Sequence, residues 1–124
     1  MDIIVDVNII VRIILNDNPA MAKNASDFIK NNDILIKNEV FAEIVYVLSK
    51  YYNMERQDIY ENIVMIMKSK RVRTESNIVI LCALELYKNR SLDFVDCLLY
   101  AYNKILGCKI YTFDDKLNKL LKQD

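Results

Sequence analysis

Histidine is absent from this chain of 124 residues, and its absence removes several kinds of catalytic site at once. There is no Ser-His-Asp or Cys-His catalysis, no histidine proton shuttle and no histidine zinc ligand. The cysteines, Cys82, Cys97 and Cys108, show no C-x-x-C spacing and lie among apolar residues. We therefore expect them to be small core residues of a protein in a reducing compartment.

Excess charge, targeting signals and long apolar runs are lacking as well. Lys plus Arg equals Asp plus Glu at 17 each, so no global field draws the chain toward nucleic acid or membrane. Asp2 stands where a signal peptide has its positive region, and Asp6 interrupts the first apolar run. No apolar stretch is long enough to span a bilayer. The sequence predicts a cytoplasmic protein without a membrane segment.

Short apolar runs predict the strands. Ile3 to Val5 is β-branched and ends in Asp6, which predicts a strand buried on both faces. Residues 34–36 and 109–112 predict two more strands, and Val72 a short edge strand. Stretches of helical periodicity separate them, at 9–15, 20–30, 38–52 (with Asn38 as N-cap), 53–68, from 76 or 77 to 88, 93–106 and 116–122.

Alternating strands and helices with connections of this length predict an α/β fold with a parallel sheet and helices on both faces. We expect a three-layer α/β/α arrangement around a small central parallel sheet. Gly107, the only glycine, is expected to stop the helix before it. With no repeat and no linker, residues 1–124 are predicted to form one domain.

Acidic residues stand where these strands end and where helices begin or border the core: Asp6 (with Asn8 two residues on), Glu43, Asp93 with Asp96, and Asp114 with Asp115. Several of them can meet at one edge of a parallel sheet, because the carboxyl ends of its strands lie together. Crowded carboxylates repel each other and raise each other's pKa. A hard cation such as Mg²⁺ or Mn²⁺ removes that cost, so the pattern favours a metal site that activates water.

Structural interpretations stay open for the same residues. Asp6 fits a metal ligand, a phosphate-site residue or a helix cap, and Glu43 fits a solvated helix flank. Asp93 and Asp114 fit N-caps, with Asp96 favourable near a helix N-terminus. Residues 53–68 are apolar nearly all round, which fits either burial or a partner surface. The basic residues 68–73 fit a solvated helix end or an RNA contact.

Four segments, VDVN at 5–8, FAEIVYVL at 41–48, LDFVDCLL at 92–99 and YTFD at 111–114, resemble the PIN-domain family, and within it the small VapC-type ribonuclease toxins of toxin–antitoxin pairs. The segments occur in the family's order and span essentially the whole chain. Cys97 departs from the small residue that the family commonly has after its third acid. A bound antitoxin would explain the apolar helix 53–68, although core packing explains it equally well.

The resemblance implies an endoribonuclease in which water attacks phosphorus with Mg²⁺ or Mn²⁺, leaving a 5′-phosphate and a 3′-hydroxyl. It implies a homodimer silenced by an antitoxin protein whose C-terminal segment lies in or near the active groove. The resemblance also implies that Asp6, Glu43, Asp96 and Asp114 are the catalytic carboxylates. Of these, Asp6, Asp96 and Asp114 would bind the metal, and Asn8, Asp93 and Asp115 would hold accessory positions. The Thr-Phe-Asp match favours Asp114 over Asp115 as the fourth acid.

Two other interpretations come from different functional classes. A PIN-like chain without catalysis would only bind RNA or a protein partner. A receiver-type signalling domain would also be a small α/β protein with Mg²⁺ on acids. The receiver needs a phosphoacceptor Asp after a middle strand, and here Lys37 follows residues 34–36.

Overall fold

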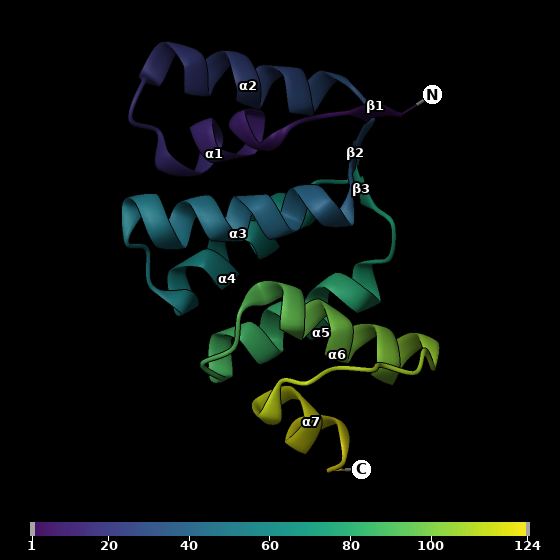
Figure 1. Ribbon diagram of the computed structural model, residues 1–124. Coiled ribbons are helices and arrows are strands. Elements are labelled where there is room, and N and C mark those ends of the chain that lie inside the picture. Colours follow the sequence, from purple (N-terminus) through teal and green to yellow (C-terminus); the bar gives the residue numbers. More distant parts are fainter. Residues whose placement is uncertain (1, 124) are drawn as a thin grey trace. The chain divides into compact units, whose positions relative to one another are not determined.

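The computed structural model describes residues 2–123, and they fall into two compact units. The N-terminal unit ends at Glu75, and the C-terminal unit begins at Ser76 (Figure 1). The N-terminal unit contains a small parallel sheet with helices, and the C-terminal unit is helical. The predicted α/β class with a small parallel sheet is confirmed.

The sheet has three strands among the described residues, β1 (Ile3–Ile4), β2 (Ile34–Ile36) and β3 (Val72–Thr74), in that spatial order. All pairs are parallel, with Ile34 of β2 opposite Ile3 on one side and Val72 on the other. Ile34 and Ile36 are completely buried, so the core of this unit lies around β2.

The prediction that the first strand is buried on both faces is wrong. Ile3 and Ile4 are 39% and 60% exposed, and only Val5, just beyond the strand, is buried. The reason is that β1 lies at the edge of the sheet, where the covering elements reach it less completely than the central β2.

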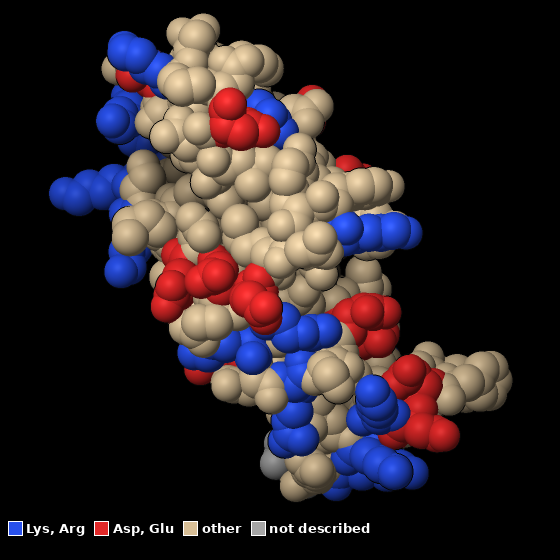
Figure 2. Space-filling model, turned by 90° about the vertical axis from the view of Figure 1, so that its left-hand side faces the viewer, with Lys and Arg blue, Asp and Glu red and all other residues tan. Residues whose placement is uncertain are grey.

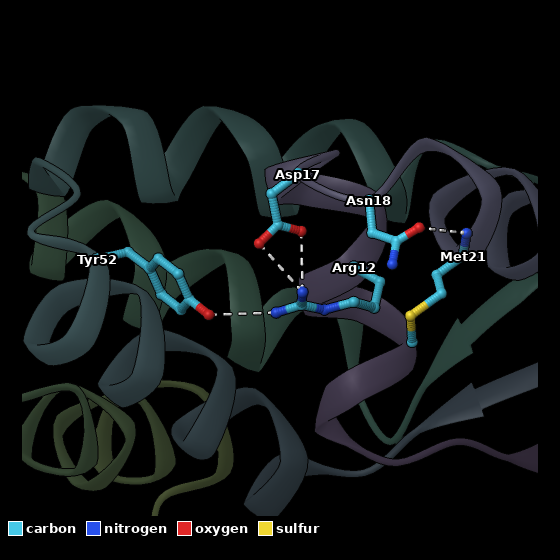
Figure 3. Close-up of polar contacts among 5 residues, drawn as sticks. All are labelled: Arg12, Asp17, Asn18, Met21 and Tyr52. Carbon is cyan, nitrogen blue, oxygen red and sulfur yellow. Dashed lines mark hydrogen bonds and ion pairs between the residues drawn. The ribbon is translucent and has the colours of Figure 1, made fainter.

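The N-terminal unit has four helices among the described residues, α1 (Val7–Leu15), α2 (Pro19–Asn31), α3 (Asn38–Tyr52) and α4 (Arg56–Met67). Asn18 caps α2 by accepting a hydrogen bond from the Met21 N–H at 3.2 Å. Arg12 of α1 donates to the Asp17 carboxylate at 2.8 Å and to the Tyr52 hydroxyl of α3 at 3.2 Å (Figure 3). These bonds fix the end of α1 to the end of α3.

Two asparagines take roles that differ from the prediction. Asn53 ends α3 in the left-handed conformation (φ 51°), which asparagine tolerates, and α4 begins only at Arg56. Asn38 is the first helical residue of α3, and Lys37 holds the N-cap position. On α4, Ile59 and Ile63 are buried while Met65 is 67% exposed, so this apolar helix serves the core and also faces solvent.

In the C-terminal unit, α5 (Asn77–Asn89) packs on α6 (Phe94–Leu106), and α7 (Asp115–Leu121) packs on α6. Tyr87 and Phe94 meet edge to face at 5.9 Å between ring centroids. Leu117 and Leu120 anchor α7 by burial. Gly107 ends α6 in the left-handed conformation (φ 74°), as predicted.

The strand predicted at 109–112 is wrong, because no described strand pairs with these residues. A strand needs a ladder partner for its backbone, and here side chains satisfy neighbouring carbonyls instead. Asn118 donates to the Thr112 carbonyl and Asn103 to the Cys108 carbonyl, each at 2.8 Å. Cys108 is consequently exposed, whereas Cys97 is buried as predicted and Cys82 is half-buried.

Candidate active site

Four acidic residues of the C-terminal unit line one depression with a volume of about 410 Å³: Asp93, Asp96, Asp114 and Asp115. They come together because α6 begins just after Asp93, α7 begins just after Asp114, and the two helices pack on each other. Ser91, Leu92 and Lys116 complete the lining. The structure therefore groups the acids of the third and fourth predicted segments in one place.

Asp96 is the half-buried member of this group. Its pKa is raised, first by its burial and then by the carboxylates of Asp114 and Asp93. The carboxylates of Asp93 and Asp114 thus lie within electrostatic reach of Asp96, and both disfavour its ionised form. A bound cation or a proton would relieve this repulsion.

Helix capping accounts for Asp114 but not for Asp93. Asp114 Oδ1 accepts a hydrogen bond from the Leu117 N–H at 2.8 Å, so this residue caps α7. Asp93 holds the N-cap position of α6 without a capping hydrogen bond from its side chain. Asp115 lines the depression too, but the two carboxylates that add to the effect of burial on the pKa of Asp96 are those of Asp114 and Asp93.

The other predicted site residues belong to the N-terminal unit. Asp6 follows β1 and holds the N-cap position of α1, again without a side-chain capping bond. Asn8 lies in the first turn of α1 and Glu43 on α3, and all three side chains are exposed. Their convergence with the acids of the C-terminal unit stays a prediction.

A metal site can be tested against the donors present. Over residues 2–123, no three acidic or cysteine side chains stand in a group that could enclose a metal ion. The donors in the acidic depression are nevertheless carboxylate oxygens, the ligands that Mg²⁺ and Mn²⁺ prefer. The donor set therefore fits such a cation in its chemistry, without forming a closed cage.

Glu75 was missed by the sequence reasoning. It directly follows β3, as Asp6 follows β1, so the same strand-end rule would have found it. Its carboxylate accepts from the Asn38 N–H at 2.7 Å and from Lys37 Nζ at 3.0 Å. These two bonds lower the pKa of Glu75, the backbone bond contributing most. Glu75 thereby holds the start of α3, the helix that carries Glu43.

Ion pairs engage part of the basic segment 68–73. Arg71 pairs with Asp33 at 3.1 Å, and Arg73 lies 3.7 Å from Asp2. These two guanidinium groups bind the protein's own carboxylates, which favours the structural interpretation over an RNA contact. None of the helices among residues 2–123 has the length and apolar character needed to cross a membrane.

Comparison with known proteins identifies the family. The model of the PIN domain family matches residues 3–122, so the protein belongs to the PIN-domain family. It is similar to the VapC ribonuclease of Aquifex aeolicus (strain VF5), with 34% identity over 92 residues, which is 73% of this chain and 68% of that protein. The predicted VapC-type membership is confirmed. No solved structure gives a significant match.

Proposed function

We propose that this protein is a metal-dependent endoribonuclease that acts as the toxin of a toxin–antitoxin pair in the cytoplasm. The observation that carries the proposal is the acidic depression, in which burial and then the carboxylates of Asp114 and Asp93 raise the pKa of Asp96. An enzyme that hydrolyses phosphodiesters with a cation needs carboxylates held together against their own repulsion. Similarity to a VapC ribonuclease supports RNA as the substrate.

Each acid has a role in this proposal. Asp6, Asp96 and Asp114 hold the cation, while Asn8, Asp93 and Asp115 support them. When bound, Mg²⁺ or Mn²⁺ supplies charge stabilisation at the phosphate and lowers the pKa of a bound water. The chain has no histidine, and we assign the role of accepting the proton of the attacking water to the carboxylate of Glu43.

Two protein partners belong to the same proposal. We propose a homodimer, and an antitoxin whose bound segment blocks the acidic site. A PIN domain that only binds RNA or protein is the second candidate function. It is favoured by one observation, that no described acidic group encloses a metal ion.

Cleavage of total cellular RNA by the purified protein tests the nuclease directly. We expect fragments with 5′-phosphate ends in Mg²⁺ or Mn²⁺ and none with a chelator. Asp96→Asn should lower the rate by roughly 10²-fold or more, because it removes charge but little volume. Asp58→Asn, in the first turn of α4, is the matched control and should cleave normally. Equal activity in both variants would reject the assigned site, and no cleavage with any metal would favour the binding-only domain.

Asp114 needs two substitutions because it also caps α7. Asparagine keeps a capping oxygen, so Asp114→Asn should lose activity at unchanged stability. Asp114→Ala should lose activity and also about 1 kcal/mol of stability. If Asp114→Asn cleaves like the wild type, Asp114 is a cap alone and Asp115 becomes the candidate.

A further inference from the structure

A second depression, of about 240 Å³, adjoins the acidic one and has the opposite charge. Three cationic residues line it, Arg90 at the end of α5 and Lys116 and Lys119 on α7. Ser91 and Gln123 add polar side chains, and none of the acidic residues between 2 and 123 is among those that line it. We call this the basic pocket. Its lining offers hydrogen-bond donors to an anion from several directions.

The basic pocket and the acidic depression share part of their walls. Ser91, Leu92 and Lys116 line both of them. A chain of phosphates that lies across this shared wall would place one phosphate at the acids and a neighbouring one at the cations. In the lower part of Figure 2, which holds the C-terminal unit, acidic side chains lie beside basic ones. Such alternation suits a polyanion that must also reach a cation-loaded acidic site.

The two lysines of the basic pocket are available for a ligand. Lys116 and Lys119 are exposed, and neither forms an ion pair with any residue between 2 and 123. They are three residues apart on α7 and therefore lie on the same side of the helix. Burial of Leu117 and Leu120 fixes that side toward the pocket. Two like charges held in this way repel each other until an anion binds between them.

We propose that the basic pocket binds a backbone phosphate of single-stranded RNA, next to the phosphodiester held at the acidic depression. The inference rests on the proposed function, because it names how that substrate is held. A phosphate accepts hydrogen bonds from lysine and arginine, and contacts of this kind position a nucleic acid without reading its sequence. An acidic peptide is less suited, because the acids of the adjoining depression would repel its further carboxylates.

Salt dependence of RNA binding tests the basic pocket separately from cleavage. Binding of a labelled single-stranded RNA is measured by fluorescence anisotropy in chelator, from about 50 to 200 mM salt. The double variant Lys116→Gln/Lys119→Gln should reduce the slope of log K against log salt by about 0.7 to 1, the value for one lost phosphate contact. The weakening should be similar for different RNA sequences.

The matched control is Lys109→Gln/Lys122→Gln, which removes the same charge from exposed lysines outside the basic pocket. Its slope should equal that of the wild type. Equal slope changes in the two double variants, or no change in either, would overturn the proposal. The proposal would also be overturned if the wild type bound poly-glutamate and the Lys116→Gln/Lys119→Gln variant lost this binding but still bound RNA. The basic pocket would then serve a protein partner.

Cleavage kinetics keep the two proposals distinguishable. If the wild type cleaves RNA, the Lys116→Gln/Lys119→Gln variant should raise KM with little change in kcat. If the wild type binds RNA with the expected slopes but cuts none, the phosphate pocket stands and the nuclease proposal fails. If it cuts RNA and the pocket variant behaves like the wild type in slope and KM, the pocket alone is rejected.

Discussion

Each unit of this protein has an acidic residue beside a helix N-terminus, and the charge of that residue is compensated in the N-terminal unit but not in the C-terminal unit. In the N-terminal unit, the Glu75 carboxylate accepts bonds from the Asn38 N–H and from Lys37, which lower its pKa. In the C-terminal unit, burial and two further carboxylates raise the pKa of Asp96. Glu75 has its charge compensated within the protein and stabilises the fold. Asp96 has not, and it is therefore the better candidate for binding something from solution.

Core truncations give the largest expected effect and test whether these two units form one domain. Ile36→Ala in the first unit and Leu84→Ala in the second should each cost about 2–5 kcal/mol, because both side chains are completely buried. If residues 1–124 are one domain, each variant should shift a single thermal unfolding transition seen by calorimetry and circular dichroism alike. Two transitions, of which each variant moves only one, would contradict the single-domain prediction.

Glu75→Gln should lower the stability by about 1 kcal/mol at neutral pH, because it removes a charged acceptor from a half-exposed site. The native pKa of Glu75 is lowered, so its contribution is present above the unfolded pKa and is lost as the pH falls through the native one. Urea denaturation at several pH values would measure this.

Asp6→Asn is the matched variant for Glu75→Gln, because Asp6 also follows a strand but makes no capping bond. Its stability should change by less than about 0.5 kcal/mol. If Glu75→Gln and Asp6→Asn lost the same stability, Glu75 would contribute no more to the fold than Asp6 does.

Asp96→Asn has the smallest expected effect on stability, and its sign is opposite. A raised native pKa means that the ionised carboxylate opposes folding above that pKa, and that stability falls as the pH rises through the window between the unfolded and native values. The variant should therefore melt slightly higher than the wild type at neutral pH and equally at acid pH. Added Mg²⁺ should raise the melting temperature of the wild type more than that of Asp96→Asn. A variant that melts lower at neutral pH would show that the Asp96 charge stabilises the fold.

The sequence predicted those parts of the fold that local pattern controls. Residues 34–36 and 38–52 form the strand and helix expected of them, because their apolar spacing is strong and their ends are marked. Residues 109–112 have the composition of a strand but form none, because a ladder depends on a partner far away in the chain. The exposure of Ile3 and Ile4 likewise depends on the place of β1 in the sheet.

The candidate site was predictable to a similar extent. The sequence predicted that Asp93, Asp96 and Asp114 would meet at the edge of a parallel sheet. The structure does place these three in one depression, but at the starts of α6 and α7 and without the strand predicted before Asp114. Lys116 and Glu75 were not singled out, because their surroundings depend on how helices pack and on which groups lie opposite. The position of an acidic residue relative to strands and helices can be predicted from the sequence. Whether its charge is compensated depends on the groups that lie around it in the folded protein.

The contacts of Arg12 at the end of α1 bear on the position of Asp6, which precedes the start of the same helix. Arg12 fastens the last turn of α1 to Tyr52 at the end of α3, while Asp6 stands before the first turn. With 9 residues, α1 is about 13 Å long, and a tilt of about 10° would move its first turn by about 2 Å. Displacements of about 1 Å are enough to slow a catalytic site. In the proposed function, where Asp6 is a site residue, the contacts of Arg12 help to hold the Asp6 carboxylate in position from the opposite end of α1.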